Sequence, residues 1–252
     1  MKYLMRQGNG IWVAAREQIA GNKTKEEIVK DLQDRTKAAQ VWFFDLDDNH
    51  ADAPARKIVM KMVGTNAFDP KFIWWVLTRG FPARFNKNGE SRAFRQYLNS
   101  FLRSKEALQR VKALYTRDIA RQSLYPGVMD FCDLFPNAKK FYITRNIAEV
   151  ADVFNEVLSF DGFFPEAYDK GKVIERYLNK NQDVKDIGID GDSREDAEMI
   201  RVARSFGKSV VSFYSMEKLR DTKMNKDFDY AVSKDRRGLV EILKRRDAHV
   251  DY

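Results

Sequence analysis

Residues 41–49 of this chain, VWFFDLDDN, decide which fold the sequence can adopt. The first four residues form a continuous apolar run, and acidic residues follow it at once. A short apolar run without alternation is typical of a strand that is buried on both faces of a parallel sheet. We therefore predict a central strand whose carboxyl end carries Asp45 and Asp47.

Beyond Pro126 and Gly127 the sequence alternates between strand-like and helix-like segments. Apolar residues at helical spacing predict helices over 146–158, 171–180 and 194–206. Strands that alternate with helices argue for a mostly parallel sheet covered on both faces, so we predict an α/β protein with a doubly wound sheet. The strand-like segments are KKFYIT at 139–144, DIGID at 186–190, KSVVSF at 208–213 and FDYAV.

Two further segments flank the first predicted strand. Residues 1–40 contain a capping-box pattern, Thr24 with Glu27, before an apolar helical face, and we predict an N-terminal helical extension there. Residues 54–124 have helical spacing throughout, which predicts a helical cap domain inserted into the core. Residues 41–53 and 125–252 would form that α/β core.

Charge is concentrated in one part of the chain. The net charge is +8, yet residues 50–124 alone hold 15 basic and 5 acidic side chains, a balance of +10 that leaves −2 for the rest. Such a field attracts phosphates, acidic metabolites or nucleic acid. The charged fraction of 33% leaves no apolar run that could cross a bilayer, the N-terminus lacks a secretory signal, and Cys132 is alone. We expect a cytoplasmic protein that binds no membrane.

Three predicted strands end in polar groups, at Asp45 to Asp48, at Thr144 to Asn146 and at Asp190 to Ser193. The carboxyl ends of parallel strands meet at one edge of a sheet, where ligands collect, so these groups should converge. A pair of carboxylates such as Asp45 and Asp47 suits phosphoryl transfer, because one can attack phosphorus while the other moves protons. Taken alone, an acidic strand end is as well explained as a solvated turn.

The segment IGIDGDSREDAEM at 187–199 offers further carboxylates. Magnesium prefers hard oxygen ligands and takes one or two protein carboxylates, so Asp192 is a candidate direct ligand. Asp196 lies one helical turn later and could act through water or orient the site. The alternative is an ordinary helix start, with Ser193 as its N-cap.

Two more polar residues fit a phosphate site. The Thr144 hydroxyl and the backbone N–H groups after it could hold phosphate oxygens. A lysine ammonium could offset the charge on nucleophile and phosphate, and Lys170 and Lys172 compete for this role.

Four segments, FFDLDDN, FYITRN, DKGKVIERYL and GIDGDSREDAEM, occur in the order of the four motifs of the haloacid dehalogenase-like superfamily, which residues 41–232 resemble. LYPGV at 124–128 resembles the segment that leads back from that family's cap. The resemblance implies a Rossmann-type core with a helical cap, and a phosphatase that needs Mg²⁺. It implies that Asp45 is the nucleophile and Asp47 the acid/base. We assign phosphate binding to Thr144, Arg145 and Lys170, and the metal to Asp45, Asp47, Asp192 and Asp196, with Lys170 also catalytic.

The sequence departs from the family after Asp47, where Asp48 and Asn49 replace the common Gly and Thr and His50 replaces an apolar residue. Asn and Asp tolerate left-handed turn geometry, so the turn can form. A structural or substrate-facing role is open for His50.

We therefore predict hydrolysis of a phosphate monoester through an aspartyl-phosphate, with a small phosphorylated, anionic substrate. Halide displacement is disfavoured because it needs neither Asp47 nor a metal. A different class, a nucleic-acid-binding protein on the same scaffold, is the weaker alternative, since Trp74, Trp75 and Phe94 of the basic segment could stack on bases. The sequence sets neither the individual substrate nor the oligomeric state.

Overall fold

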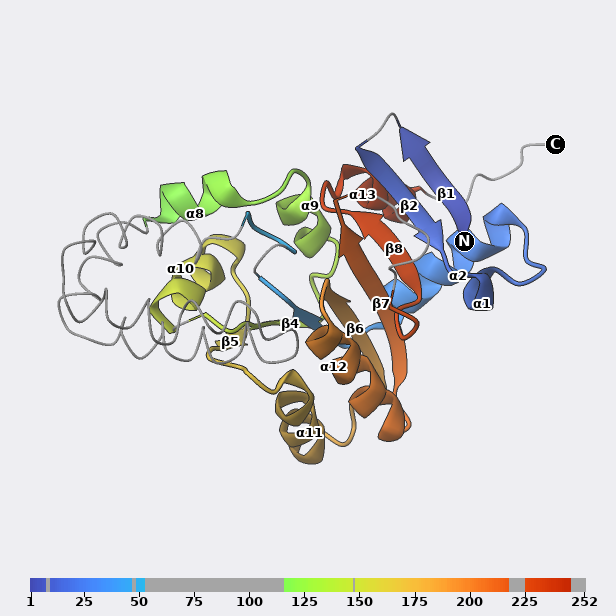
Figure 1. Cartoon of the computed structure of the whole chain (residues 1–252). Coiled ribbons are helices and arrows are strands. Elements are labelled where there is room, and N and C mark those ends of the chain that lie inside the picture. Colours follow the sequence, from blue (N-terminus) through green and yellow to red (C-terminus); the bar gives the residue numbers. More distant parts are fainter. Residues whose placement is uncertain (8–9, 47–48, 53–115, 147, 218–224, 246–252) are drawn as a thin grey trace, which may run out of the picture.

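The computed structural model describes residues 1–7, 10–46, 49–52, 116–146, 148–217 and 225–245 (Figure 1). Predictions for Asp47, Asp48 and residues 54–115, including Trp74, Trp75 and Phe94, lie outside the described residues. The strands are β1 (Lys2–Gln7), β2 (Ile11–Ala15), β3 (Val41–Phe44), β4 (Lys139–Ile143), β5 (Gly162–Phe164), β6 (Asp186–Gly191), β7 (Ser209–Met216) and β8 (Tyr230–Ser233). The helices are α1 (Glu17–Ala20), α2 (Lys25–Ala38), α8 (Arg117–Ser123), α9 (Val128–Asp133), α10 (Ala148–Leu158), α11 (Lys170–Lys180), α12 (Arg194–Ser205) and α13 (Arg237–Lys244).

These strands form one sheet in the order β1-β2-β8-β7-β6-β3-β4-β5. From β8 to β5 every neighbouring pair is parallel, whereas β1 and β2 join the β8 edge in antiparallel fashion. The sheet confirms the predicted doubly wound, mostly parallel α/β fold. Strand order changes direction beside β3, which lies between β6 and β4. A switch point of this kind is where ligands bind in open α/β sheets.

Helices cover both faces of the sheet (Figure 1). One hydrophobic cluster packs α2, α9, α10 and α13 against the sheet, and a second cluster packs α11 and α12 against it. Successive side chains of β3 alternate between them, with Trp42 and Phe44 in the first and Val41 and Phe43 in the second, so the clusters lie on opposite faces. Among the described helices, none has the length and apolarity to cross a membrane.

Complete burial of β3 explains why its sequence does not alternate. All four residues of the strand are buried, as predicted for a central strand. The Trp42 indole stacks on Phe135 and Phe213, with ring centroids 4.6 and 5.8 Å away. Gly188 on the neighbouring strand makes room for it, since a Cβ there would lie 2.1 Å from the indole ring. This packing fixes the strand that ends just before Asp45.

The N-terminal segment differs from the helical extension that we predicted. Its helix is confirmed, because Thr24 and Glu27 form the capping box at the start of α2. However, β1 and β2 precede it as an antiparallel hairpin, and β2 pairs with β8. The hairpin covers the β8 edge and buries Leu4 and Trp12. Without the hairpin, the backbone N–H and C=O groups along this edge of the sheet would be unpaired. Residues 1–40 are therefore part of the sheet as well as its helical cover.

The chain leaves and re-enters the core at one place. The N–H of Asp52 donates to the carbonyl of Ser123 at 3.0 Å, and the N–H of Tyr125 donates to the carbonyl of His50 at 2.9 Å. Ala51 and Leu124 form an antiparallel bridge between these hydrogen bonds. The described residues on either side of 53–115 thus lie side by side, which is compatible with an insertion. Its last helix, α8, packs against α10.

Candidate active site

Polar residues at the ends of three adjacent strands come together at the switch point. Phe44 at the end of β3 pairs with Tyr142 of β4 and with Asp190 of β6. Asp45 and Thr144 follow their strands, and Asp192 follows β6 by one residue. The structure therefore brings the predicted polar strand ends to one edge of the sheet.

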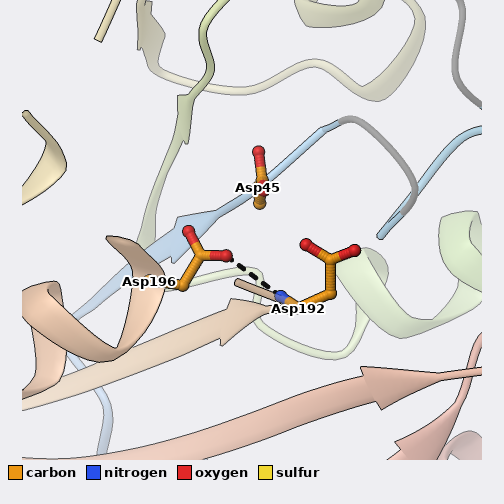
Figure 2. A group of neighbouring side chains, drawn as sticks. All are labelled: Asp45, Asp192 and Asp196. Carbon is orange, nitrogen blue, oxygen red and sulfur yellow. Dashed lines mark hydrogen bonds between the residues drawn. The ribbon is translucent and has the colours of Figure 1, made fainter. Parts of the chain in front are cut away.

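Three carboxylates form the centre of this site. Asp45, Asp192 and Asp196 each offer an oxygen, and these oxygens all lie within 4.8 Å of one another (Figure 2). Asp45 and Asp196 are buried, whereas Asp192 is half-buried. Three hard oxygen donors at this spacing fit a divalent cation such as Mg²⁺. We call these three carboxylates and the Lys170 ammonium the acidic site.

Asp196 is held by the protein through both of its oxygens. Its Oδ2 accepts from the N–H of Asp192 at 3.0 Å, the N–H of Ser193 at 2.9 Å and the Ser193 hydroxyl at 2.6 Å. Its Oδ1 accepts from the Lys170 ammonium at 2.6 Å. Burial would raise the pKa of Asp196, but the charge of Lys170 and the hydrogen bonds from Ser193 lower it. This carboxylate therefore fits a role in orienting Asp192 and Lys170 better than a role as a direct ligand.

The residues just before Asp196 lie in close contact with its carboxylate. Ser193 caps α12, as the N-cap alternative predicted, and Asp196 completes a capping box with it. Gly191 is needed beside it, because a Cβ on this residue would lie 2.4 Å from the Asp196 Cγ. The helix start thus serves as both a cap and a support for the carboxylates.

Lys170 begins α11 and points into the acidic site. Its ammonium lies 2.8 Å from Asp45 Oδ2, and its side chain is 2% exposed. Burial alone would lower the pKa of Lys170, but the charges of Asp196 and Asp45 raise it above its ordinary value, so the ammonium stays charged. Lys172 instead lies at the surface beside Asp169, with 67% of its side chain exposed. Of the two competing lysines, the structure brings Lys170 to Asp45.

Thr144 connects the end of β4 to the segment that carries Lys170. It is fully buried, its carbonyl accepts from the N–H of Ala167 at 2.9 Å, and its hydroxyl accepts from the N–H of Asn146 at 3.1 Å. A hydroxyl can accept and donate at once, so it can still donate to a phosphate oxygen. Arg145, the next residue, forms an ion pair with Glu195 of α12. A phosphate at Arg145 would have to compete with this carboxylate.

Several solved structures with a similar fold are named as a nucleotidase or as phosphatases. The chain superposes on a cytosolic 5'-nucleotidase IIIB bound to cytidine with a TM-score of 0.59 and 10% identity, covering 92% of each chain. It superposes on a phosphoserine phosphatase in apo form with a TM-score of 0.52 and 14% identity, covering 82% of this chain and 98% of the other. A probable phosphoserine phosphatase from Vibrio cholerae gives a TM-score of 0.52 at 16% identity, over 87% and 71% of the two chains.

The chain shares its α/β fold with these solved structures, which agrees with the fold predicted from the sequence. At this level of identity the comparison establishes the fold alone. No protein-family model and no curated protein matches the sequence. The roles of individual residues therefore rest on the geometry of this chain itself.

Behind the acidic site lies a second polar group that sequence reasoning did not assign. Asp190 and Arg236 form a fully buried ion pair, with Arg236 Nη2 2.9 Å from both carboxylate oxygens. His50 is also fully buried, and its Nε2 lies 3.1 Å from Asp190 Oδ2 and its Nδ1 lies 3.3 Å from the Tyr142 hydroxyl. His50 is thus structural and does not face a substrate. We call Asn49, His50, Asp190, Ser215 and Arg236 the buried polar layer.

Proposed function

We propose that this chain is a phosphatase that hydrolyses a phosphate monoester through an aspartyl-phosphate on Asp45, with Mg²⁺ as its cofactor. The observation that carries the proposal is the contact of the Asp45 carboxylate with a buried, charged Lys170 inside a cluster of three carboxylates. A plain solvated turn needs no buried lysine. Proteins of similar fold that are named as a 5'-nucleotidase and a phosphoserine phosphatase support the same reaction class.

Asp45 is placed to act as the nucleophile. Its Oδ1 accepts from the N–H of Leu46 at 2.8 Å and its Oδ2 contacts Lys170, so the carboxylate has a fixed orientation. In the proposed reaction a carboxylate oxygen bonds to phosphorus while the bond from phosphorus to the ester oxygen breaks. Water then attacks phosphorus, which releases phosphate and restores Asp45. Lys170 offsets the negative charge that gathers between the carboxylate and the phosphoryl oxygens.

Proton transfer falls to Asp47 in this proposal, on the basis of the sequence. It would protonate the leaving oxygen in the first step and take a proton from the hydrolytic water in the second. Thr144 and Arg145 would bind the phosphoryl oxygens, Arg145 after release from Glu195. Mg²⁺, when bound between Asp45 and Asp192, would neutralise charge on the phosphoryl group. Asp196 would keep Asp192 and Lys170 in place.

The substrate proposed is small, phosphorylated and anionic. The excess of basic residues over 50–124 favours a molecule with negative charge beyond the phosphate that is cleaved. Nucleic-acid binding rests on this charge and on Trp74, Trp75 and Phe94 of the same segment, whereas the acidic site favours catalysis.

The proposal is tested by phosphate release from an aryl phosphate and from a panel of phosphorylated metabolites, with Mg²⁺ and with a chelator. We expect turnover in Mg²⁺ and its loss in chelator. Salt-dependent binding of an oligonucleotide together with no phosphate release from any ester would support the nucleic-acid alternative and reject the phosphatase.

A further inference from the structure

The buried polar layer connects distant parts of the chain to the backbone of Asp45. Asn49 Nδ2 donates to the carbonyl of Asp45 at 3.1 Å and to the carbonyl of Asp190 at 3.1 Å. The N–H of Asp45 also donates to the carbonyl of Asp190, at 2.9 Å. Both backbone polar groups of Asp45 are therefore fixed by residues of this layer.

Arg236 fixes the orientation of the Asn49 amide. Its Nη2 donates to Asn49 Oδ1 at 2.7 Å, and the Ser215 hydroxyl contacts the same oxygen. Because an amide presents an acceptor on one side and donors on the other, this contact turns Asn49 Nδ2 toward the Asp45 carbonyl. Arg236 itself is anchored, since its Nη1 donates to the carbonyl of Ser233 at 2.6 Å.

Stability alone does not account for a buried charged pair at this place. The side chains of Asp190 and Arg236 are 0% exposed. The Arg236 guanidinium lies 5.9 Å from the centre of the buried Phe131 ring. Removing two charges from water costs several kcal/mol per ion, and a well-packed apolar pair is often as stable or more stable. The particular contribution of this pair is its directed hydrogen bonding toward Asn49.

We propose that Arg236 is a positioning residue for the nucleophile, acting through Asn49 on the backbone of Asp45. The inference rests on the proposed function, in which Asp45 attacks phosphorus. Arg236 does not touch the reacting atoms. It links the end of β8 to the loop after β3, and thereby keeps the Asp45 carboxylate aligned with Lys170.

The test must separate positioning from folding. Arg236→Met alone leaves Asp190 as an unpaired buried charge and is expected to lower stability strongly. The double variant Asp190→Asn with Arg236→Met removes both charges and keeps a hydrogen-bond partner for His50. We expect it to recover most of the lost thermal stability, yet to keep a kcat that is roughly 10- to 100-fold below wild type, with KM little changed. Arg237→Met, at an arginine with 62% of its side chain exposed, is the matched control and should leave kcat unchanged.

A variant cycle tests the route through Asn49. If Arg236 acts through this residue, Asn49→Ala should lower kcat alone and should add little to the double variant. If the losses in kcat of Asn49→Ala and of the double variant multiply when combined, Arg236 does not act through Asn49. If the double variant recovers wild-type kcat together with stability, Arg236 has no positioning role.

Amide hydrogen exchange over residues 41–46 separates this inference from the proposed function. The double variant should exchange the Asp45 amide faster than wild type, whether or not the chain cleaves an ester. Faster exchange in a protein that releases no phosphate would reject the phosphatase and keep the positioning contact. Unchanged exchange and unchanged kcat in an active protein would reject the positioning role alone.

Discussion

Two groups of buried charged side chains lie close together in this molecule and differ in their balance of charge. The acidic site holds three carboxylates against one ammonium, an excess of two negative charges among the described residues. The buried polar layer holds one carboxylate, Asp190, and one guanidinium, Arg236, beside His50. Burial lowers the pKa of His50, so this ring is neutral near pH 7.

This difference in charge indicates that the acidic site binds a cation, whereas the buried polar layer keeps neighbouring residues in position. Buried negative charge in excess is unfavourable without a cation, and the half-exposed Asp192 gives a cation from solution access to the acidic site. In the buried polar layer the charge of Asp190 is balanced by that of Arg236, so its charge does not call for a cation. The comparison predicts that changes at the acidic site affect chemistry, whereas changes in the layer affect alignment and stability.

The largest effect is expected from Asp45→Asn, which keeps the shape of the side chain and removes the nucleophilic charge. Phosphate release should fall by at least about 10³-fold, as for other nucleophiles that are removed. Asp152→Asn on the exposed surface of α10 is the control and should retain full activity. Substantial turnover by a folded Asp45→Asn protein would remove Asp45 from the nucleophile role.

Lys170→Ala comes next. Loss of the ammonium leaves the charge on Asp45 and the phosphoryl group without its buried counter-charge, so we expect kcat to fall about 10²- to 10³-fold. Lys172→Ala should have little effect, because this lysine lies at the surface. Steady-state kinetics of the two variants compare their kcat values. A larger loss of kcat in Lys172→Ala than in Lys170→Ala would mean that Lys170 is not the lysine that serves Asp45.

A smaller effect is expected from Gly191→Ala. The new Cβ would lie 2.4 Å from Asp196 Cγ, so this carboxylate must shift and carry Asp192 and Lys170 with it. We expect a loss of about tenfold in kcat/KM. The control is Gly162→Ala, whose Cβ would lie at an ordinary 3.5 Å from the Phe141 ring. Equal activities of the two variants would contradict a supporting role for Asp196.

The smallest effect concerns pH and the buried polar layer. Burial lowers the pKa of His50; burial would raise the pKa of Asp190, but Arg236 and His50 lower it. Both groups thus bind fewer protons in the folded chain than in the unfolded one. Their contributions to stability are present above the unfolded pKa values, about 6.5 and 3.9, and are lost as pH falls below them.

His50→Gln should remove the loss of stability that is caused by protonation of His50 on unfolding. Between pH 8 and pH 5, wild type should lose more free energy of unfolding than this variant, by at most about 1.4 kcal/mol per pH unit. Denaturant unfolding at several pH values measures the difference. The second histidine, His249, is present in both proteins and cancels. Parallel pH curves would mean that His50 does not titrate with unfolding.

Much of the core could be predicted from sequence because strong local patterns set it. The unbroken apolar run of β3 and the alternation of strands and helices after Gly127 predicted the parallel sheet. Acidic residues at the ends of two strands predicted the carboxylates that come together in the acidic site. The hairpin of β1 and β2 was not predicted, because the prediction for residues 1–40 rested on the capping box of the helix that follows it. The GNG sequence at 8–10, typical of turns, was the available signal.

The buried polar layer was missed for a different reason. Arg236 and Arg237 are adjacent and chemically identical, yet the first is fully buried and the second is exposed. Only the tertiary arrangement of β8 beside β7 distinguishes them. Asp190 carried a signal, since an acid inside an apolar strand requires a partner, but the sequence does not say which residue supplies it.

Whether the acidic site takes a divalent cation can be measured by calorimetric titration of the protein with Mg²⁺. Wild type should bind one Mg²⁺ per chain, and Asp192→Asn should weaken this binding at least about tenfold. Asp186→Asn, at the opposite end of β6, should bind Mg²⁺ as wild type does. Absence of Mg²⁺ binding by the wild-type protein, or equal affinities in all three proteins, would mean that the acidic site does not bind this cation.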